Sequence, residues 1–209
     1  MKKFLMLAAL VVVAFMPAAA KADIVAVGDL VKFSDHAGRF GSAGPFNLIN
    51  TSQSNDTWVT FCLEENEYLD FSNLFEVVGI SDEAVNGGSG GGSPDKLDPR
   101  SAFLYTQFRS GNLSYQDTAA LQHAIWYIEQ ETGGSPISGT ALTYVTNAGL
   151  AGWTDIGNVR VLNLNQTTTN YSGYPRAQDV LVLVPDGGAT LSLLGGALLG
   201  LAALRRRMR

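Results

Sequence analysis

Short apolar runs separated by Gly, Asn, Ser and Asp predict β-strands at both ends of the central part of the chain. They cover residues 24–33, 46–49, 57–63, 74–80, 159–164 and 180–184. Each run is rich in β-branched and aromatic residues and is flanked by turn residues, which is typical of strands.

The stretch between these runs predicts helices instead. Asp98 followed by Pro99 is typical of a helix N-cap and first helical position, and this helix should end near Arg109, before Gly111. A weaker helix is expected over residues 141–148. The fold class is therefore α+β, a β-rich domain with a helical middle.

A further helix is expected from about Ser114, whose spacing to Asp117 resembles a capping box, to about Glu131. Its apolar residues recur at helical spacing and predict the buried face: Leu121, Ala124, Ile125 and Ile128. The glycine-rich segment 86–93 lacks the lysine of a phosphate-binding loop, so we expect a flexible linker there.

The N-terminus predicts a secretory signal peptide over residues 1–22. Lys2 and Lys3 precede an apolar run over residues 4–20, and small residues up to Ala22 fit cleavage after that position. The folded domain is then expected to lie outside the cytoplasm.

The other end of the chain has three parts in order. A short motif comes first: Val184, Pro185, Asp186, Gly187 and Gly188. An apolar segment of about 15 residues follows, and as a hydrophobic helix it would cover roughly 22 Å, less than the ~30 Å hydrocarbon core. The cluster of Arg205, Arg206 and Arg207 should then stay on the cytoplasmic side as a membrane stop.

These three parts, residues 184–209, resemble the PEP-CTERM class of bacterial sorting signals in the variant with Val-Pro-Asp. The resemblance implies cleavage near the motif by an exosortase, an integral-membrane enzyme, after a transient stay of the helix in the membrane. It also implies delivery to the cell surface or the extracellular matrix. The alternative is an ordinary C-terminal tail anchor.

Without residues 1–22 and 189–209, about 166 residues remain, enough for one exported domain over residues 23–183 with a hydrophobic core. All 19 acidic residues lie in residues 23–188 against seven basic ones, which leaves a net charge near −12. Such a charge repels phosphate backbones, so we expect no nucleic-acid partner.

A single cysteine, Cys62, follows Phe61 in a predicted strand, and the predicted second helix carries the sequence Gln122-His123-Ala124-Ile125-Trp126. Over about residues 57–131 this pair of motifs resembles the thioester domains of bacterial surface adhesins. The resemblance implies that the Cys62 thiolate attacks the Gln122 carboxamide and expels ammonia, while Phe61 and Trp126 keep water away. An amine or hydroxyl of a partner would then attack the thioester and become bound to Gln122.

Other interpretations remain open. Cys62 could be an inert buried thiol in a non-covalent matrix protein, a partner in an intermolecular disulfide, or a cysteine-hydrolase nucleophile. Neither histidine lies in a recognisable signature, and His123 would point about 100° away from Gln122 on a helix. A run of acids, Glu64, Glu65, Glu67 and Asp70, lacks the spacing of a calcium loop and predicts a solvated acidic face. We therefore expect no metal, no cofactor and no enzymatic activity, but an adhesive or structural role.

Overall fold

The structure is a computed structural model that describes residues 22–36, 44–53, 55–67, 69–85, 90, 92–167, 177–185 and 205. Its elements, in chain order, are β1 (Leu30–Asp35), β2 (Phe46–Asn50), β3 (Asp56–Thr60), β4 (Phe75–Ser81), β5 (Glu83–Ala84), β6 (Asp95–Lys96), α2 (Pro99–Arg109), the 3-10 helix η1 (Leu113–Tyr115), α3 (Thr118–Ile128), α4 (Gly139–Ala151), β7 (Val159–Gln166) and β8 (Val180–Leu183). The predicted α+β class, with strands on both sides of a helical middle, is confirmed.

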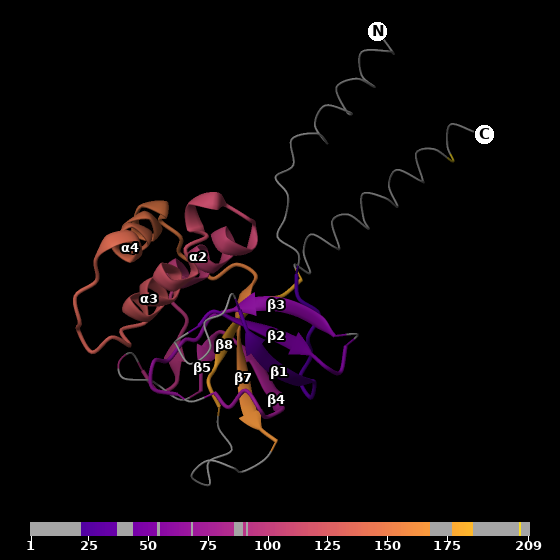
Figure 1. The fold of residues 1–209 in the computed structure, drawn as a ribbon. Coiled ribbons are helices and arrows are strands. Elements are labelled where there is room, and N and C mark those ends of the chain that lie inside the picture. Colours follow the sequence, from indigo (N-terminus) through magenta and orange to yellow (C-terminus); the bar gives the residue numbers. More distant parts are fainter. Residues whose placement is uncertain are drawn as a thin grey trace.

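Six of the strands form one antiparallel sheet in the order β3-β2-β1-β4-β7-β8, and β5 pairs with β6 separately. The chain beyond β3 returns to the opposite edge of the sheet, where Cys62 pairs with Val180 of β8. The sheet is therefore nearly closed, and Cys62 lies at the point of closure. Figure 1 shows α2, α3 and α4 gathered on one side of this sheet.

Strand β8 is buried on both faces because the helices cover one side of it and the curled sheet encloses the other. Side chains on the two faces belong to separate clusters. The helical cluster includes Phe61, Leu63, Leu104, Tyr105, Leu121, Ala124, Ile125, Ile128, Val159, Val161, Leu181 and Leu183. The interior cluster includes Val31, Phe33, Phe46, Leu48, Trp58, Cys62, Phe75, Val77, Trp126, Leu162, Leu164, Val180 and Val182.

The two ends of the domain are joined by a buried network around Asp23. Its backbone N–H donates to the Leu183 carbonyl at 2.7 Å, and its carboxylate accepts from the Leu183 N–H at 3.0 Å. The guanidinium of Arg109 in α2 donates to both carboxylate oxygens at 2.7 Å. This network thus starts at Asp23, one residue after Ala22, the predicted signal-peptide cleavage position. That cleavage stays a prediction because residues 1–21 lie outside the described part.

Several predicted boundaries are wrong, and the strand expected over residues 57–63 already ends at Thr60. The strand expected over residues 24–33 begins only at Leu30, because a turn with a left-handed Gly28 (φ 92°) precedes it. The helix expected from Ser114 begins at Thr118, because the Asp117 side chain accepts from the Ala120 N–H at 3.1 Å and caps it there.

The same helix ends at Ile128, three residues before the predicted end. Gln130 adopts a left-handed conformation (φ 67°), which is incompatible with a continuing helix.

The apolar segments expected at the two ends of the chain, residues 4–20 and 189–204, lie outside the described residues. In the part that the structure describes, none of the helices has the length and apolarity needed to cross a membrane. The glycine-rich segment 86–93 is described only in part, at residues 90, 92 and 93.

Candidate functional site

Cys62 continues the line of β3 and has one backbone edge paired with β8. The flanking residues make these bonds: the Leu181 N–H donates to the Phe61 carbonyl and the Leu63 N–H donates to the Asp179 carbonyl, both at 3.2 Å. Backbone groups of successive residues in a strand point to opposite edges. The N–H and C=O of Cys62 itself therefore point away from β8.

The side chain of Gln122 satisfies this second edge. The Cys62 N–H donates to Gln122 Oε1 at 2.9 Å, and Gln122 Nε2 donates to the Cys62 carbonyl at 2.8 Å. Gln122 is completely buried and Cys62 is 3 % exposed. A helix residue and a strand residue that are 60 positions apart are thus joined by two reciprocal bonds in a site closed to water.

Gly44 leaves the space in which the Gln122 carboxamide lies. The β2–β3 register pairs Phe46 with Thr60, so its continuation places Gly44 opposite Cys62. A Cβ built on Gly44 would clash with Gln122 Oε1 and lie 3.4 Å from Gln122 Cδ. The carboxamide thus lies where the backbone groups of Gly44 and Cys62 would otherwise pair with each other. A side chain at position 44 would fill this space, so only glycine permits the arrangement.

Helix α3 delivers Gln122 to the strand. Its cap at Asp117 sets the helix start, and Gln122 and Trp126, four residues apart, share one face. The predicted stripe of Leu121, Ala124, Ile125 and Ile128 is buried in the helical cluster. Packing of that stripe against α2 and α4 therefore fixes the direction in which the Gln122 side chain points.

The two residues predicted to shield the site lie on different sides of it. Trp126 packs in the interior cluster with Cys62, and only 6 % of its surface is exposed. Phe61 points the other way into the helical cluster, where it makes edge-to-face contacts with Tyr105 and Phe108. Trp126 thus belongs to the same buried cluster as Cys62, whereas Phe61 packs among the helices on the other side.

Burial raises the pKa of the Cys62 thiol well above its usual range. A hydrogen bond from the Gly44 backbone acts in the opposite direction, and the nearby Glu64 and Glu67 raise the pKa further. The resting group is therefore a neutral thiol at neutral pH, and any attack by its sulfur requires proton removal during the step.

The prediction of a solvated acidic face is wrong for Glu64, which is 2 % exposed. Burial raises the pKa of Glu64 to about 10, and the neighbouring Glu67, Asp179 and Glu131 act in the same direction. Its backbone carbonyl accepts from Gln178 Nε2 at 2.8 Å. The closure of the sheet turns this residue inward, whereas Glu65 next to it stays exposed.

The two histidines have partners elsewhere. His123 lies on the exposed side of α3 and stacks on Trp126 with ring centroids 6.0 Å apart. His36 Nδ1 lies 2.9 Å from Asn47 Oδ1. The cysteine-hydrolase alternative gains no support from these positions. Among the described residues no group of three or more His, Cys, Asp or Glu side chains is arranged to hold a metal ion.

Only the start of the predicted sorting motif is described. Val184 follows β8 and its N–H donates to the Asn158 carbonyl at 2.9 Å, and Pro185 comes next. Asp186, Gly187 and Gly188 lie outside the described residues, as do Arg206 and Arg207, while Arg205 is exposed.

Sequence reasoning missed Gly44 and the Asp23–Arg109 pair. The sequence Gly44-Pro45 before a predicted strand could have drawn attention to Gly44, because proline has no N–H and ends regular strand pairing there. Arg109 is one of few basic residues in the domain, but no local pattern connects it with Asp23.

Comparison with protein families identifies the end of the chain. Residues 184–208 match the VPDSG-CTERM motif, a PEP-CTERM-like sorting signal. The motif indicates an exported, cell-envelope-associated protein and is consistent with processing by an exosortase-type enzyme. No curated protein and no solved structure matches the chain. The resemblance to thioester domains therefore stays a prediction that depends on the residues themselves.

Proposed function

We propose that this exported protein is a non-enzymatic adhesive or structural component of the cell surface or extracellular matrix. Its domain forms an internal thioester between Cys62 and Gln122, which couples covalently to a nucleophile on a partner. The observation that carries the proposal is the pair of reciprocal hydrogen bonds between the Gln122 carboxamide and the backbone of Cys62 in a buried site.

The bond forms in one balanced substitution. Cys62 Sγ attacks Gln122 Cδ, the S–C bond forms and the Cδ–Nε2 bond breaks. The thiol proton passes to the departing nitrogen, and ammonia leaves. The Cys62 N–H already donates to Oε1, where negative charge develops during the attack, so it acts as a preorganised oxyanion donor.

The thioester then transfers its acyl group to a partner. An amine or hydroxyl attacks Cδ, the C–S bond breaks, and the nucleophile's proton goes to the Cys62 sulfur. The partner becomes joined to Gln122 through an amide or ester, and the thiol is restored. Burial of both residues keeps water from competing, which is the condition for such an acyl donor to persist.

Intact mass measures the proposed bond directly. The purified protein should be lighter by one ammonia than its sequence requires, and methylamine should add to Gln122 and free the thiol. Cys62→Ala and Gln122→Glu are matched controls that should show their full masses. A full-mass wild-type protein whose mass methylamine leaves unchanged would refute the thioester.

A second candidate function has its own observation in favour. Gln122 is fully hydrogen-bonded as an ordinary carboxamide, and loss of ammonia would leave the Cys62 carbonyl without its present donor. In that case Gln122 only fastens α3 to the sheet, Cys62 is inert, and the protein is a non-covalent matrix component. The mass measurement separates the two functions.

A further inference from the structure

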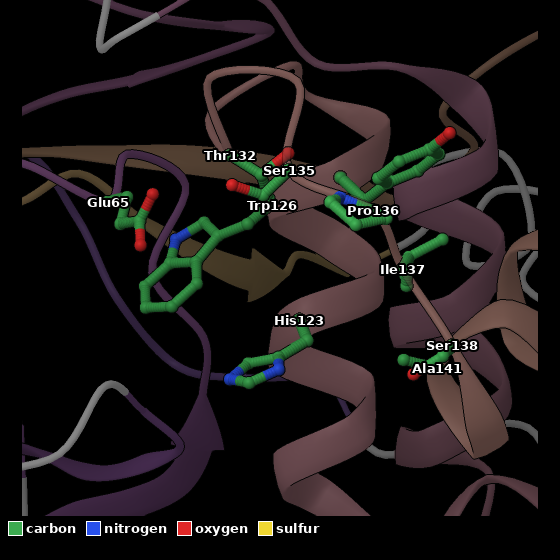
Figure 2. A pocket seen from close by; sticks show the side chains of 10 residues that line it. Glu65, His123, Trp126, Thr132, Ser135, Pro136, Ile137, Ser138 and Ala141 are labelled. Carbon is green, nitrogen blue, oxygen red and sulfur yellow. The ribbon is translucent and has the colours of Figure 1, made fainter.

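A cavity of about 300 Å³ opens beside α3, between that helix and the loop that leads to α4. Figure 2 shows that Glu65 lies on one side, Trp126 and His123 form the wall along the helix, and Thr132, Ser135 and Ser138 come from the loop side. Trp126 lines this cavity and also belongs to the interior cluster that contains Cys62.

Trp126 carries a hydrogen-bond donor that needs an acceptor. More than nine-tenths of Trp126 is buried. Its Nε1 is also buried and has no hydrogen-bond partner among the described residues. Figure 2 shows the nitrogen edge of the indole turned toward the Glu65 side of the cavity. A buried N–H without a partner costs free energy, which a ligand that accepts its hydrogen bond would recover.

The lining decides which ligand chemistry fits. An ammonium group would suit Glu65 but offers no acceptor to Trp126. A phosphate or carboxylate would accept from Trp126 but would meet the Glu65 carboxylate in a domain of strong negative charge. A hydroxyl group does both, since it accepts from the indole N–H and donates to the carboxylate or to a serine or threonine oxygen.

We propose that this cavity binds a hydroxyl-rich sugar ring of a carbohydrate. The hydroxyls of the sugar bond to Trp126 Nε1, the Glu65 carboxylate and the hydroxyls of the loop, and its C–H face packs against the aromatic wall. Recognition itself does not need the thioester. The further step, in which the cavity holds a carbohydrate hydroxyl near the acyl carbon of Gln122, one helical turn away, rests on the proposed function.

Ligand-observed saturation-transfer NMR tests the cavity with a defined panel: glucose, galactose, mannose, N-acetylglucosamine and their disaccharides, with methylamine and inorganic phosphate as probes of the competing chemistries. At least one sugar should bind to wild type and to Cys62→Ala alike. Trp126→Phe should weaken that binding by about tenfold, the effect of one lost hydrogen bond. Glu65→Gln should also weaken it.

Trp58→Phe is the matched control. Trp58 Nε1 is equally buried and has no partner among the described residues, but Trp58 lies in β3 outside the cavity lining. This variant should bind sugar as wild type does. Absence of binding by every sugar, binding of phosphate instead, or equal effects of the two Trp→Phe changes would overturn the proposal.

The two proposals fail separately. A full-mass wild-type protein that binds sugar would remove the thioester and keep the carbohydrate site. A protein that lacks one ammonia but binds no sugar would keep the thioester and remove the carbohydrate site.

Discussion

The space at Gly44 allows a sharp test of the Cys62–Gln122 contact. In Gly44→Ala the new methyl group would collide with Gln122 Oε1 and approach Cδ to 3.4 Å. The Gly44 backbone itself is not in the left-handed region that favours glycine, so alanine adds no backbone strain. The effect of the change therefore comes from Gln122.

The size of the effect follows from the bonds at the site. Gln122 is completely buried, so its carboxamide cannot move aside without giving up both bonds to Cys62. A buried donor or acceptor left unpaired costs about 1–3 kcal/mol. Alanine also restricts the unfolded chain more than glycine does, which stabilises the folded state by about 0.4–1 kcal/mol. With two bonds lost at that cost each, and this gain subtracted, we expect Gly44→Ala to lower the free energy of unfolding by about 1–6 kcal/mol.

Urea unfolding followed by tryptophan fluorescence measures this difference, and intact mass follows the thioester in the same samples. Gly149→Ala is the control, because Gly149 lies on the exposed side of α4 and a Cβ there meets no heavy atom within 4 Å. That variant should be more stable by up to about 1 kcal/mol. Equal stability of Gly44→Ala and wild type would refute the account of the site, and so would a Gly44→Ala protein that still loses ammonia.

Three further outcomes follow from the structure. Burial raises the pKa of Glu64 in the folded protein from its ordinary value of 4.5 to about 10, so its contribution to stability is fully present below pH 4.5 and is lost as the pH rises toward 10. Urea titrations should therefore show greater stability at pH 5 than at pH 8, and Glu64→Gln should reduce this difference; an unchanged difference in Glu64→Gln would contradict the reasoning. Arg109→Met leaves the carboxylate of Asp23 buried without its cation, and should lower the free energy of unfolding by about 3–5 kcal/mol in the same assay; a loss below 1 kcal/mol would mean that the pair is dispensable. Replacing Pro185 and Asp186 by alanine should leave the protein in the inner-membrane fraction on cell fractionation; normal delivery would refute the role of the motif.

The parts of the fold that local chemistry sets were predictable. Asp98 and Pro99 start α2 as expected, and the Asp98 carboxylate accepts from the Arg100 N–H at 2.8 Å. The valine-rich β8 was recognisable because it is buried on both faces. The start of α3 was misplaced because Ser114 lies inside the separate turn η1, which Asn112 caps, whereas Asp117 caps α3.

Features that depend on distant pairing could not be predicted. The inward position of Glu64 follows from the return of the chain after β3 to β8, which no local pattern reveals. The role of Gly44 depends on the β2–β3 register, because only that register places it opposite Cys62. Resemblance alone paired Cys62 with Gln122, and the structure adds that the carboxamide lies against the backbone of the cysteine.

The position of Cys62 beside the start of β8 has a mechanical consequence. A partner coupled to Gln122 would pull on the molecule near Val180, whereas a cell-envelope attachment through the C-terminus would pull at Val184, the other end of the same short strand. Tension would then run along β8. Its hydrogen bonds to β7 lie across that direction, so they would resist as a group in shear and would not open one after another. The two hydrogen bonds between Asp23 and the Leu183 backbone would further resist separation at the pulled end.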